Sequence, residues 1–350
     1  MEIAQELILW YLQNKRDLPW RNTRNPYYIW LAEVILQQTR VNQGMEYYLR
    51  FIDKYPNVKK LAKAEEDEIL KMWQGLGYYT RARNLHAAAQ YISNELNRVF
   101  PDRYNDILKL PGVGPYTAAA IASFAFKLPH AVVDGNVSRV LSRIFDIDTP
   151  INSPAGKKQI QVIADACLST SEPDTYNQAI MELGATICKP INPDCQNCPL
   201  FFKCISRKEN TMHLRPVKIK SKKPVVRYMD FAVLESDQDL IFKKRTGNDI
   251  WKGLHDFTSI EGMKEPTEKY ITKQLVEKFP GIQLNRIPHT HHKEYIYLLS
   301  HQRILARFWS YKYSGTLNNN SVYFSVPKHS LELLAVPRLI QKYLEDENFV

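Results

Sequence analysis

Cysteine is scarce in this chain, with five among 350 residues. So few cysteines exclude a small secreted fold whose stability depends on disulfides. No uninterrupted apolar run approaches the roughly 18 residues that a membrane helix needs. Glu2 and Glu6 fall where a signal peptide would have its basic start and apolar middle, which disfavours secretion. We therefore expect a cytoplasmic protein without a membrane segment, and we find no internal repeat.

Basic residues outnumber acidic residues by 47 to 37, and the net charge of +10 favours a polyanionic partner. Residues 207–227 hold eight basic residues and one acid. This segment lacks sustained apolar periodicity and contains Pro216 and Pro224, which is typical of a linker. Its charge is compatible with a solvated linker and with direct phosphate contacts.

The apolar pattern changes across this linker. Before it, apolar residues three and four positions apart predict helices at residues 27–39, 66–77, 82–96, 116–126 and 157–168. After it, short β-branched and aromatic runs predict strands at 228–236, 239–245 and 304–311, with a helix at 267–279. We expect a mainly α-helical domain at residues 1–206, a basic linker at 207–227 and a smaller α+β domain at 228–350.

Four cysteines lie close together with the spacing C-x6-C-x2-C-x5-C, namely Cys188, Cys195, Cys198 and Cys204. In a cytosolic protein, four soft thiolate ligands favour a metal centre over disulfides. The spacing alone fits a four-cysteine zinc site and a cubane iron–sulfur cluster. Cys167 lies in the apolar stretch VIADACL and is expected to be a core residue.

The stretch LKLPGVGPYTAAAIASFAF, residues 108–126, predicts a helix ending near Leu110, a Gly-rich hairpin and a helix starting at Pro115. The first turn of a helix offers unpaired N–H groups and a favourable dipole to a phosphate. Gly112 and Gly114 would let the backbone approach a phosphodiester closely. Proline–glycine turns are also ordinary loop chemistry, so the hairpin alone decides little.

Two carboxylates are candidates for catalysis. Asp134 ends an apolar run and precedes a helical pattern, where an Asp is usually an N-cap, but its charge could also face a developing cation. Glu33 lies on a helix whose neighbouring positions are mostly apolar. It is either exposed at the edge of that stripe, or half buried with a raised pKa that suits a general acid.

These motifs together resemble the helix-hairpin-helix, Gly/Pro…Asp superfamily of DNA glycosylases. The hairpin LPGVGPYTA, the aspartate of VDGN and the cysteine loop follow one another in the family's order. Four longer stretches resemble the MutY type, the adenine DNA glycosylases: LPWR (18–21), WLAEVILQQT (30–39), GLGYYTRARNLHAAA (75–89) and YNQAIMELGATIC (176–188). The resemblance covers the whole first domain, and the position of the second domain fits it.

The resemblance implies that Glu33 protonates the adenine leaving group and activates water. It makes Asp134 the carboxylate that stabilises the oxocarbenium-like sugar, and it places Asn136 and Tyr116 in the same pocket. The endonuclease III type carries a lysine at the position of Tyr116 that forms a Schiff base. With tyrosine there, the resemblance implies a monofunctional glycosylase that leaves an abasic site.

Further positions match family residues that contact DNA or the target base. Gln37, Gln38 and Tyr78 match residues that wedge into the base stack or contact the opposite strand. In the hairpin region, the expected DNA-binding residues are Gly112, Gly114 and Thr117. Arg21 and Glu182 match positions around the adenine pocket. Glu182 is alternatively a structural helix residue.

The second domain resembles the Nudix-like recognition domain of the family, and WKGLHDF (251–257) follows its pattern. No glutamate-rich Nudix hydrolase box is present, so metal-dependent nucleotide hydrolysis is not expected. The family reads 8-oxoguanine with a Phe-Ser-His loop. This chain has Leu299, Ser300 and His301 instead, which puts the stacking role of the aromatic in doubt. The histidine-rich segment 289–295 is a competing candidate.

The resemblance implies one [4Fe-4S] cluster per chain, and as partner a DNA duplex with adenine opposite 8-oxoguanine or guanine. We expect a monomer. Two other classes are weighed: an endonuclease III-like lyase, which would need a lysine at Tyr116, and a non-catalytic iron–sulfur DNA-binding protein, which would need neither Glu33 nor Asp134.

Overall fold

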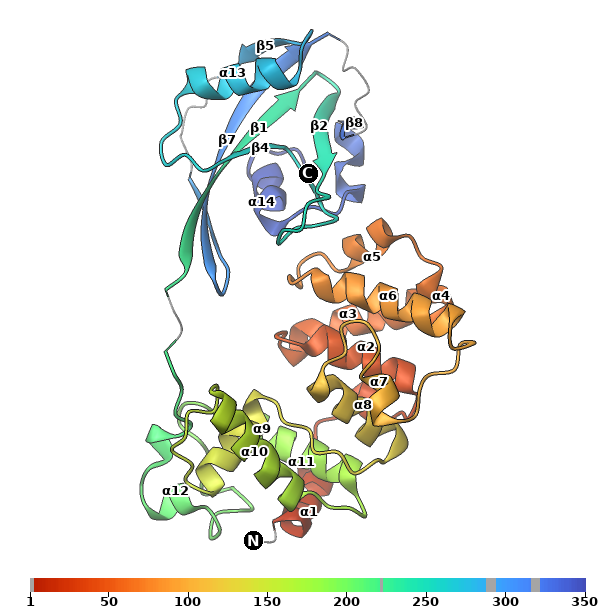
Figure 1. The fold of residues 1–350 in the computed structure, drawn as a ribbon, viewed down its shortest axis with the longest axis vertical. Helices are drawn as coiled ribbons and strands as arrows, with labels where there is room; N and C mark the ends of the chain where they lie inside the picture. Colours follow the sequence, from red (N-terminus) through yellow and green to blue (C-terminus); the bar gives the residue numbers. More distant parts are fainter. Residues whose placement is uncertain (1–2, 221–222, 288–293, 316–321) are drawn as a thin grey trace. The chain divides into compact units, whose positions relative to one another are not determined.

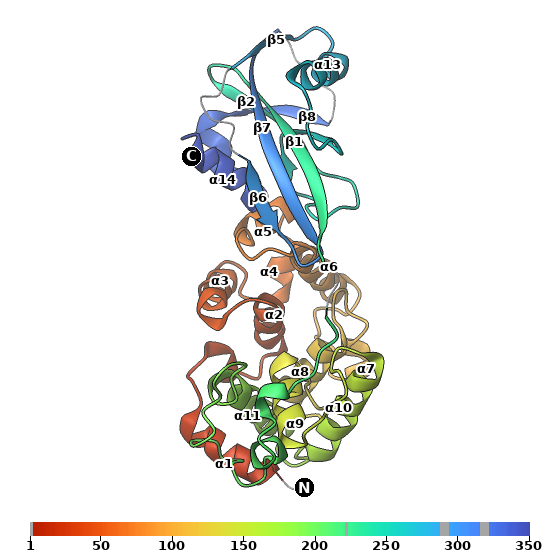
Figure 2. The ribbon, with the colours of Figure 1, turned by 90° about the vertical axis from the view of Figure 1, so that its left-hand side faces the viewer.

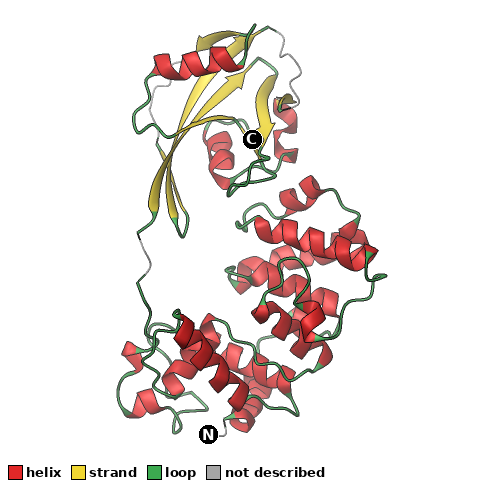
Figure 3. Cartoon of the chain, viewed as in Figure 1, coloured by secondary structure: helices red, strands yellow, loops and turns green. Residues whose placement is uncertain are grey.

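The computed structural model describes residues 3–220, 223–287, 294–315 and 322–350 (Figure 1). The chain forms two compact units, one of residues 1–63 with 84–220 and one of residues 64–83 with 221–350. Helices make up most of the first unit and a sheet dominates the second, as Figure 3 shows. Residues 64–83 group with the second unit although they precede the linker in the sequence.

Within the described residues, the helical part of the chain contains fourteen short to medium elements. They are α1 (Ala4–Asn14), η1 (Pro19–Arg21), α2 (Pro26–Leu36), α3 (Val41–Lys54), α4 (Val58–Ala62), α5 (Glu66–Met72), α6 (Thr80–Asn94), α7 (Tyr104–Ile107), α8 (Pro115–Phe126), α9 (Gly135–Ile144), α10 (Pro154–Cys167), α11 (Pro173–Thr186), α12 (Ile205–Lys208) and η2 (Met212–Leu214). The helices predicted from periodicity are confirmed, with ends that differ by a few residues.

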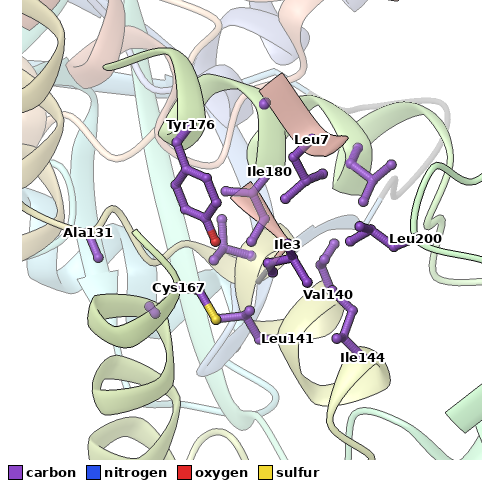
Figure 4. Packing of buried hydrophobic residues seen from close by; sticks show 14 of the residues in the cluster. Ile3, Leu7, Ala131, Val140, Leu141, Ile144, Cys167, Tyr176, Ile180 and Leu200 are labelled. Atoms are coloured by element: carbon purple, nitrogen blue, oxygen red, sulfur yellow. The ribbon is translucent and has the colours of Figure 1, made fainter. Parts of the chain in front are cut away.

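A buried apolar cluster holds α1, α9, α10 and α11 together. Leu7 of α1, Leu141 of α9 and Ile180 of α11 are almost completely buried in it (Figure 4). Cys167 packs into the same cluster, as its apolar surroundings predict, and burial raises the pKa of its thiol. This packing fixes the orientation of α9, whose first residues belong to the site described below.

The described residues of the second unit form a sheet of eight strands. Its elements after the linker are β1 (Val225–Glu235), β2 (Asp239–Lys244), β3 (His255–Asp256), β4 (Thr258–Glu261), α13 (Glu268–Lys278), β5 (Gln283–Arg286), β6 (Tyr295–Leu298), β7 (Gln302–Ser314), β8 (Tyr323–Pro327), η3 (Lys328–Leu333) and α14 (Arg338–Asp346). The strand order is β3-β2-β1-β7-β5, with β4 also paired to β1, β6 to β7 and β8 to β2. The predicted α+β class is confirmed.

The two faces of the sheet carry different cores because side chains alternate along a strand. Ala232 and Leu234 of β1 pack against α13, where Leu275 is fully buried. On the other face, the ring of Phe308 in β7 stacks on Tyr343 of α14, with 3.9 Å between the centroids. β1 and β7 are parallel neighbours along their whole common length.

Among the described helices, none has the length and apolar character to cross a membrane.

Candidate active site

The hairpin before α8 has the tight geometry that its glycines predict. α7 ends at Ile107, and a tighter three-residue turn continues to Leu110, whose N–H donates to the Ile107 carbonyl at 3.1 Å. Gly112 has φ +73°, and a Cβ at this position would lie 2.5 Å from the Cβ of Asn84. Only glycine therefore fits there. α8 then begins with Pro115 at its first position, and no side chain caps its N-terminus in the described structure.

A pocket of about 180 Å³ opens beside α2, α8, α9 and α11. It brings together six of the residues that the sequence singled out, although they are far apart along the chain. These are Arg21, Glu33, Tyr116, Asp134, Asn136 and Glu182. Thr117 lies outside it, buried, and its hydroxyl accepts a hydrogen bond from the amide of Gln37 at 3.1 Å. That bond joins the end of α2 to the start of α8.

Glu33 is buried, which excludes the alternative of an exposed helix edge and is nearer the half-buried alternative. Its Oε2 accepts a hydrogen bond from the Tyr116 hydroxyl at 2.8 Å. Burial raises the pKa of Glu33 to about 7, and the negative charge of Asp134 acts in the same direction. The Tyr116 hydrogen bond and the charge of Arg21 oppose this rise. The carboxyl can thus hold a proton near neutral pH.

Asp134 is both an N-cap and a pocket residue. Its Oδ1 accepts the backbone N–H of Val137 at 2.7 Å, which caps α9. Its Oδ2 accepts the side-chain amide of Asn136 at 3.0 Å. Burial raises the pKa of Asp134, while these hydrogen bonds and the charge of Arg139 oppose the rise. The cap therefore anchors a carboxylate that faces the pocket.

Arg139 is a buried residue that the sequence reading missed. Its guanidinium donates to the side-chain oxygen of Asn136 at 2.9 Å and to the carbonyls of Gly184 at 2.7 Å and Cys188 at 2.8 Å. Asn136 also packs closely against Gly184, where an added Cβ would lie 2.7 Å from the Cβ of Asn136. Arg139 shares a helical face with Asn136 and Arg143, three and four positions away, and nothing in this polar local pattern indicates that the face is buried. Arg139 joins the pocket to the first cysteine of the loop.

Glu182 is fully buried at the back of the pocket. Arg16 donates to both of its oxygens, at 2.6 and 2.7 Å, and Arg21 donates to Oε2 at 2.7 Å. Burial alone would raise the pKa of Glu182, but the hydrogen bonds and charges of the two arginines outweigh it and lower the pKa to about 2. Glu182 is therefore an anion that holds Arg21 against the pocket. Arg16 and Gln178, which also lines the pocket, were missed by the sequence reading.

The four predicted ligand cysteines line one cavity together with apolar side chains of α9 and α11. Arg143 donates toward the sulfur of Cys188 at 3.4 Å and to the carbonyls of Lys189 and Pro190 at 2.7 and 3.0 Å. Burial raises the pKa of Cys198 to about 12, so metal binding there must displace a proton. Within the described ranges, no three His, Cys, Asp or Glu side chains are arranged to hold a metal ion.

Two predicted DNA-contact residues have unusual backbone. Gln38 has φ +57° and Tyr78 has φ +48°, a backbone conformation that is uncommon outside glycine. The ring of Tyr78, in the second unit, is half exposed, and the guanidinium of Arg81 lies 5.8 Å from its centroid. In the same unit, Ser300 and His301 form the exposed turn between β6 and β7. His289–His292 lie outside the described residues.

Comparison with known proteins identifies the family. Residues 31–163 match the model of the HhH-GPD superfamily base excision DNA repair protein. The chain is 31% identical over 352 aligned residues to the adenine DNA glycosylase of Buchnera aphidicola subsp. Acyrthosiphon pisum, covering 98% of this chain and 97% of that relative. This chain belongs to the adenine DNA glycosylases. A second relative, the Homo sapiens adenine DNA glycosylase, is 42% identical over 57% of this chain and 38% of its own length.

The glycosylase fold also has a solved counterpart. A thermostable thymine-DNA glycosylase superposes with a TM-score of 0.55 and 30% identity, over 59% of this chain and 95% of that structure. The helical fold of the first unit is thus the fold of a DNA glycosylase.

The ion pairs of Glu182 make a stability prediction for this glycosylase. Glu182→Gln removes the anion between Arg16 and Arg21, and it should lower the free energy of unfolding at pH 7 by about 3 kcal/mol, near the lower end for breaking a buried pair. Because the folded pKa lies near 2 and the ordinary value is 4.5, this stabilisation is complete above pH 4.5 and is lost as the pH falls toward 2. Urea unfolding of both proteins between pH 7 and pH 3 measures it, and a difference that does not shrink in acid would contradict it.

Proposed function

We propose that this enzyme excises adenine paired with 8-oxoguanine, and also with guanine, from duplex DNA by hydrolysing the N-glycosidic bond. This step would initiate base excision repair. The observation that carries the proposal is the buried Glu33 carboxyl, hydrogen-bonded to Tyr116 and facing a pocket that it shares with Asp134. The adenine DNA glycosylases to which the chain is similar support the choice of base.

Glu33 supplies the proton that adenine needs in order to leave. Adenine is a poor leaving group as an anion, and protonation of a ring nitrogen lowers the barrier to its departure. A carboxyl with a pKa of about 7 is partly protonated at neutral pH and also leaves a usable base behind. The same residue can therefore protonate adenine first and then accept a proton from the attacking water.

Asp134 stabilises the positive charge that develops at the anomeric carbon as the base leaves. The Val137 N–H and the Asn136 amide hold its two oxygens, so it needs little reorganisation during the reaction. Tyr116 offers no amine for a Schiff base, and the described lining of the pocket includes no lysine. We therefore assign a monofunctional mechanism with water as the nucleophile, which leaves an abasic site.

The DNA must present adenine outside the helical stack, because the pocket cannot reach a paired base. The N-terminus of α8 and the tight Gly112 turn suit a phosphate of the target strand. Gln37, Gln38 and Tyr78 are the proposed wedge and strand contacts. We propose that Ser300 and His301 read 8-oxoguanine, since a hydroxyl can both donate and accept a hydrogen bond. We propose that the enzyme acts as a monomer in the cytoplasm.

We propose that Cys188, Cys195, Cys198 and Cys204 hold one [4Fe-4S] cluster. All four line a single cavity, and thiolates are the ligands that such clusters take. The cluster would fix the shape of the loop that Arg139 and Arg143 contact.

Single-turnover excision on matched duplexes tests the proposed reaction. The wild-type enzyme should release adenine opposite 8-oxoguanine and guanine, and strand scission should appear only after alkali. Glu33→Gln should slow excision by at least about 10²-fold, because an amide keeps the shape but donates no carboxyl proton. The control is Glu46→Gln, which makes the same charge change at an exposed position of α3. Excision by Glu33→Gln near the wild-type rate would contradict the proposal, and scission without alkali would indicate a lyase.

Metal analysis tests the cluster. Anaerobically purified protein should contain about four irons per chain, as one cubane cluster requires, and little zinc. Cys198→Ser should lose iron, whereas Cys167→Ala, which changes a cysteine in the core, should retain it. Stoichiometric zinc without iron in the wild-type protein would overturn the assignment.

A further inference from the structure

The Ser300–His301 turn stands at the end of a three-stranded arm. β6, β7 and β1 lie side by side in Figure 2, and Figure 1 shows β1 and β7 extending beyond β2 and β5. The turn is closed by a hydrogen bond from the Leu299 N–H to the Gln302 carbonyl at 2.8 Å. The Val225 N–H of β1 donates to the His301 carbonyl at 3.0 Å. The position of the turn therefore depends on β1 as well as on its own hairpin.

One row of residues crosses this arm just behind the turn. Arg227 of β1 is in register with Ile304 of β7, and Ile304 is in register with Tyr297 of β6. The two outer members of the row carry large side chains that reach beyond the arm. Their contacts determine how firmly the arm is held.

Arg227 is held by two carboxylates. It donates to both oxygens of Asp249, at 3.0 and 2.7 Å, and twice to Oε2 of Glu261, at 3.0 and 2.7 Å. These contacts raise the pKa of Arg227 and hold the pKa of Asp249 well below its usual range. A planar guanidinium with this many partners has one orientation, because the bidentate pair with Asp249 fixes its plane.

The contacts of Asp249 continue to β6, the strand on the other side of the arm. Arg245 donates to Asp249 and to the fully buried Asp256, both at 2.6 Å. The guanidinium of Arg245 lies 5.8 Å from the ring of Trp251. Trp251 in turn packs on Tyr297, with 6.0 Å between ring centroids. The contacts thus run from Arg227 through Asp249, Arg245 and Trp251 to Tyr297, and they link the two outer strands of the arm just behind the turn.

We propose that this ring of contacts, the arm bracket, positions the Ser300–His301 turn, and that Arg227 is a positioning residue for discrimination between 8-oxoguanine and guanine. The inference rests on the proposed role of Ser300 and His301. A single partly exposed ion pair contributes little to stability. We therefore infer that the ion pairs around Arg227 serve to fix the position of the arm. A recognition turn must be held to a fraction of an ångström if its hydrogen bonds are to distinguish two bases. The bracket also gives the WKGLHDF segment a role, through Trp251.

The experiment compares single-turnover excision rates on 8-oxoguanine:A and G:A duplexes. Arg227→Met keeps the aliphatic stem and removes the ion pairs, and it should lower the ratio of the two rates about 10-fold, because small misplacements of contacting groups are costly. Arg227→Lys restores the charge without the bidentate geometry and should give an intermediate ratio. The G:A rate should stay within about 2-fold of wild type, since Glu33 and Asp134 belong to the other unit.

Arg307→Met is the matched control. Arg307 makes a bidentate pair with Asp230 across the same two strands, at 2.9 and 3.1 Å, but lies further from the turn. Losing this pair leaves the buried Asp230 carboxylate without its cation, which should cost at least as much stability as Arg227→Met, and it should leave the ratio unchanged. A thermal melt of each variant confirms folding, and Asp249→Asn replaces Arg227→Met if the latter does not fold.

The reference variant is Ser300→Ala combined with His301→Ala, which should lower the ratio about 10- to 100-fold through lost hydrogen bonds. If this variant lowers the ratio while Arg227→Met does not, the bracket proposal is overturned, and the proposed recognition of 8-oxoguanine by Ser300 and His301 stands. If Arg307→Met lowers the ratio as much as Arg227→Met, general loosening explains the effect and the bracket proposal is also overturned. An unchanged ratio in the reference variant would instead overturn the proposal that Ser300 and His301 recognise 8-oxoguanine.

Discussion

The hydrogen bond between Tyr116 and the buried Glu33 carboxyl is the interaction on which the proposed chemistry depends. An acid that works near neutral pH needs a pKa well above that of a solvated glutamate, and only burial supplies so large a rise here. Tyr116 limits the rise, because its hydroxyl donates to the ionised form. The two effects together leave Glu33 able to give a proton and take one back. Packing of α2 against α8 keeps the Tyr116 hydroxyl within hydrogen-bond distance of the Glu33 carboxyl.

Helix α9 connects Asp134, the carboxylate proposed to act in catalysis, to the cysteine loop. Asp134 caps its first turn, Arg139 contacts the Cys188 carbonyl one turn later, and Arg143 contacts the Cys188 sulfur after one further turn. The apolar face of the same helix is fixed by the core of α1, α10 and α11. A change in the loop would therefore reach Asp134 through one rigid element. The metal site would then have a structural role in catalysis, even at a distance from the base.

The fold was largely predictable from the sequence, because its helices are amphipathic and its strands are bounded by turn residues. The pocket residues were found only through long motifs, since spacing along the chain does not show which side chains meet. Arg16 and Glu182 are 166 positions apart, and nothing local indicates that they pair. Whether Glu33 is exposed or buried likewise depends on what covers α2. Arg139 and the contacts around Arg227 were missed for the same reason, because each depends on several segments that meet only in the fold.

Titration of the Glu33 side chain tests the central claim most directly. Carboxyl carbon NMR of isotopically labelled protein, with Glu33→Gln to assign the resonance, reports the pKa without DNA. The account predicts a pKa of about 7 in the wild-type enzyme. It predicts a further rise in Tyr116→Phe, where the hydrogen bond that favours the ionised form is lost. A pKa near the ordinary value of 4.5 would contradict the account, because Glu33 would then be ionised throughout the neutral range and could not act as the acid.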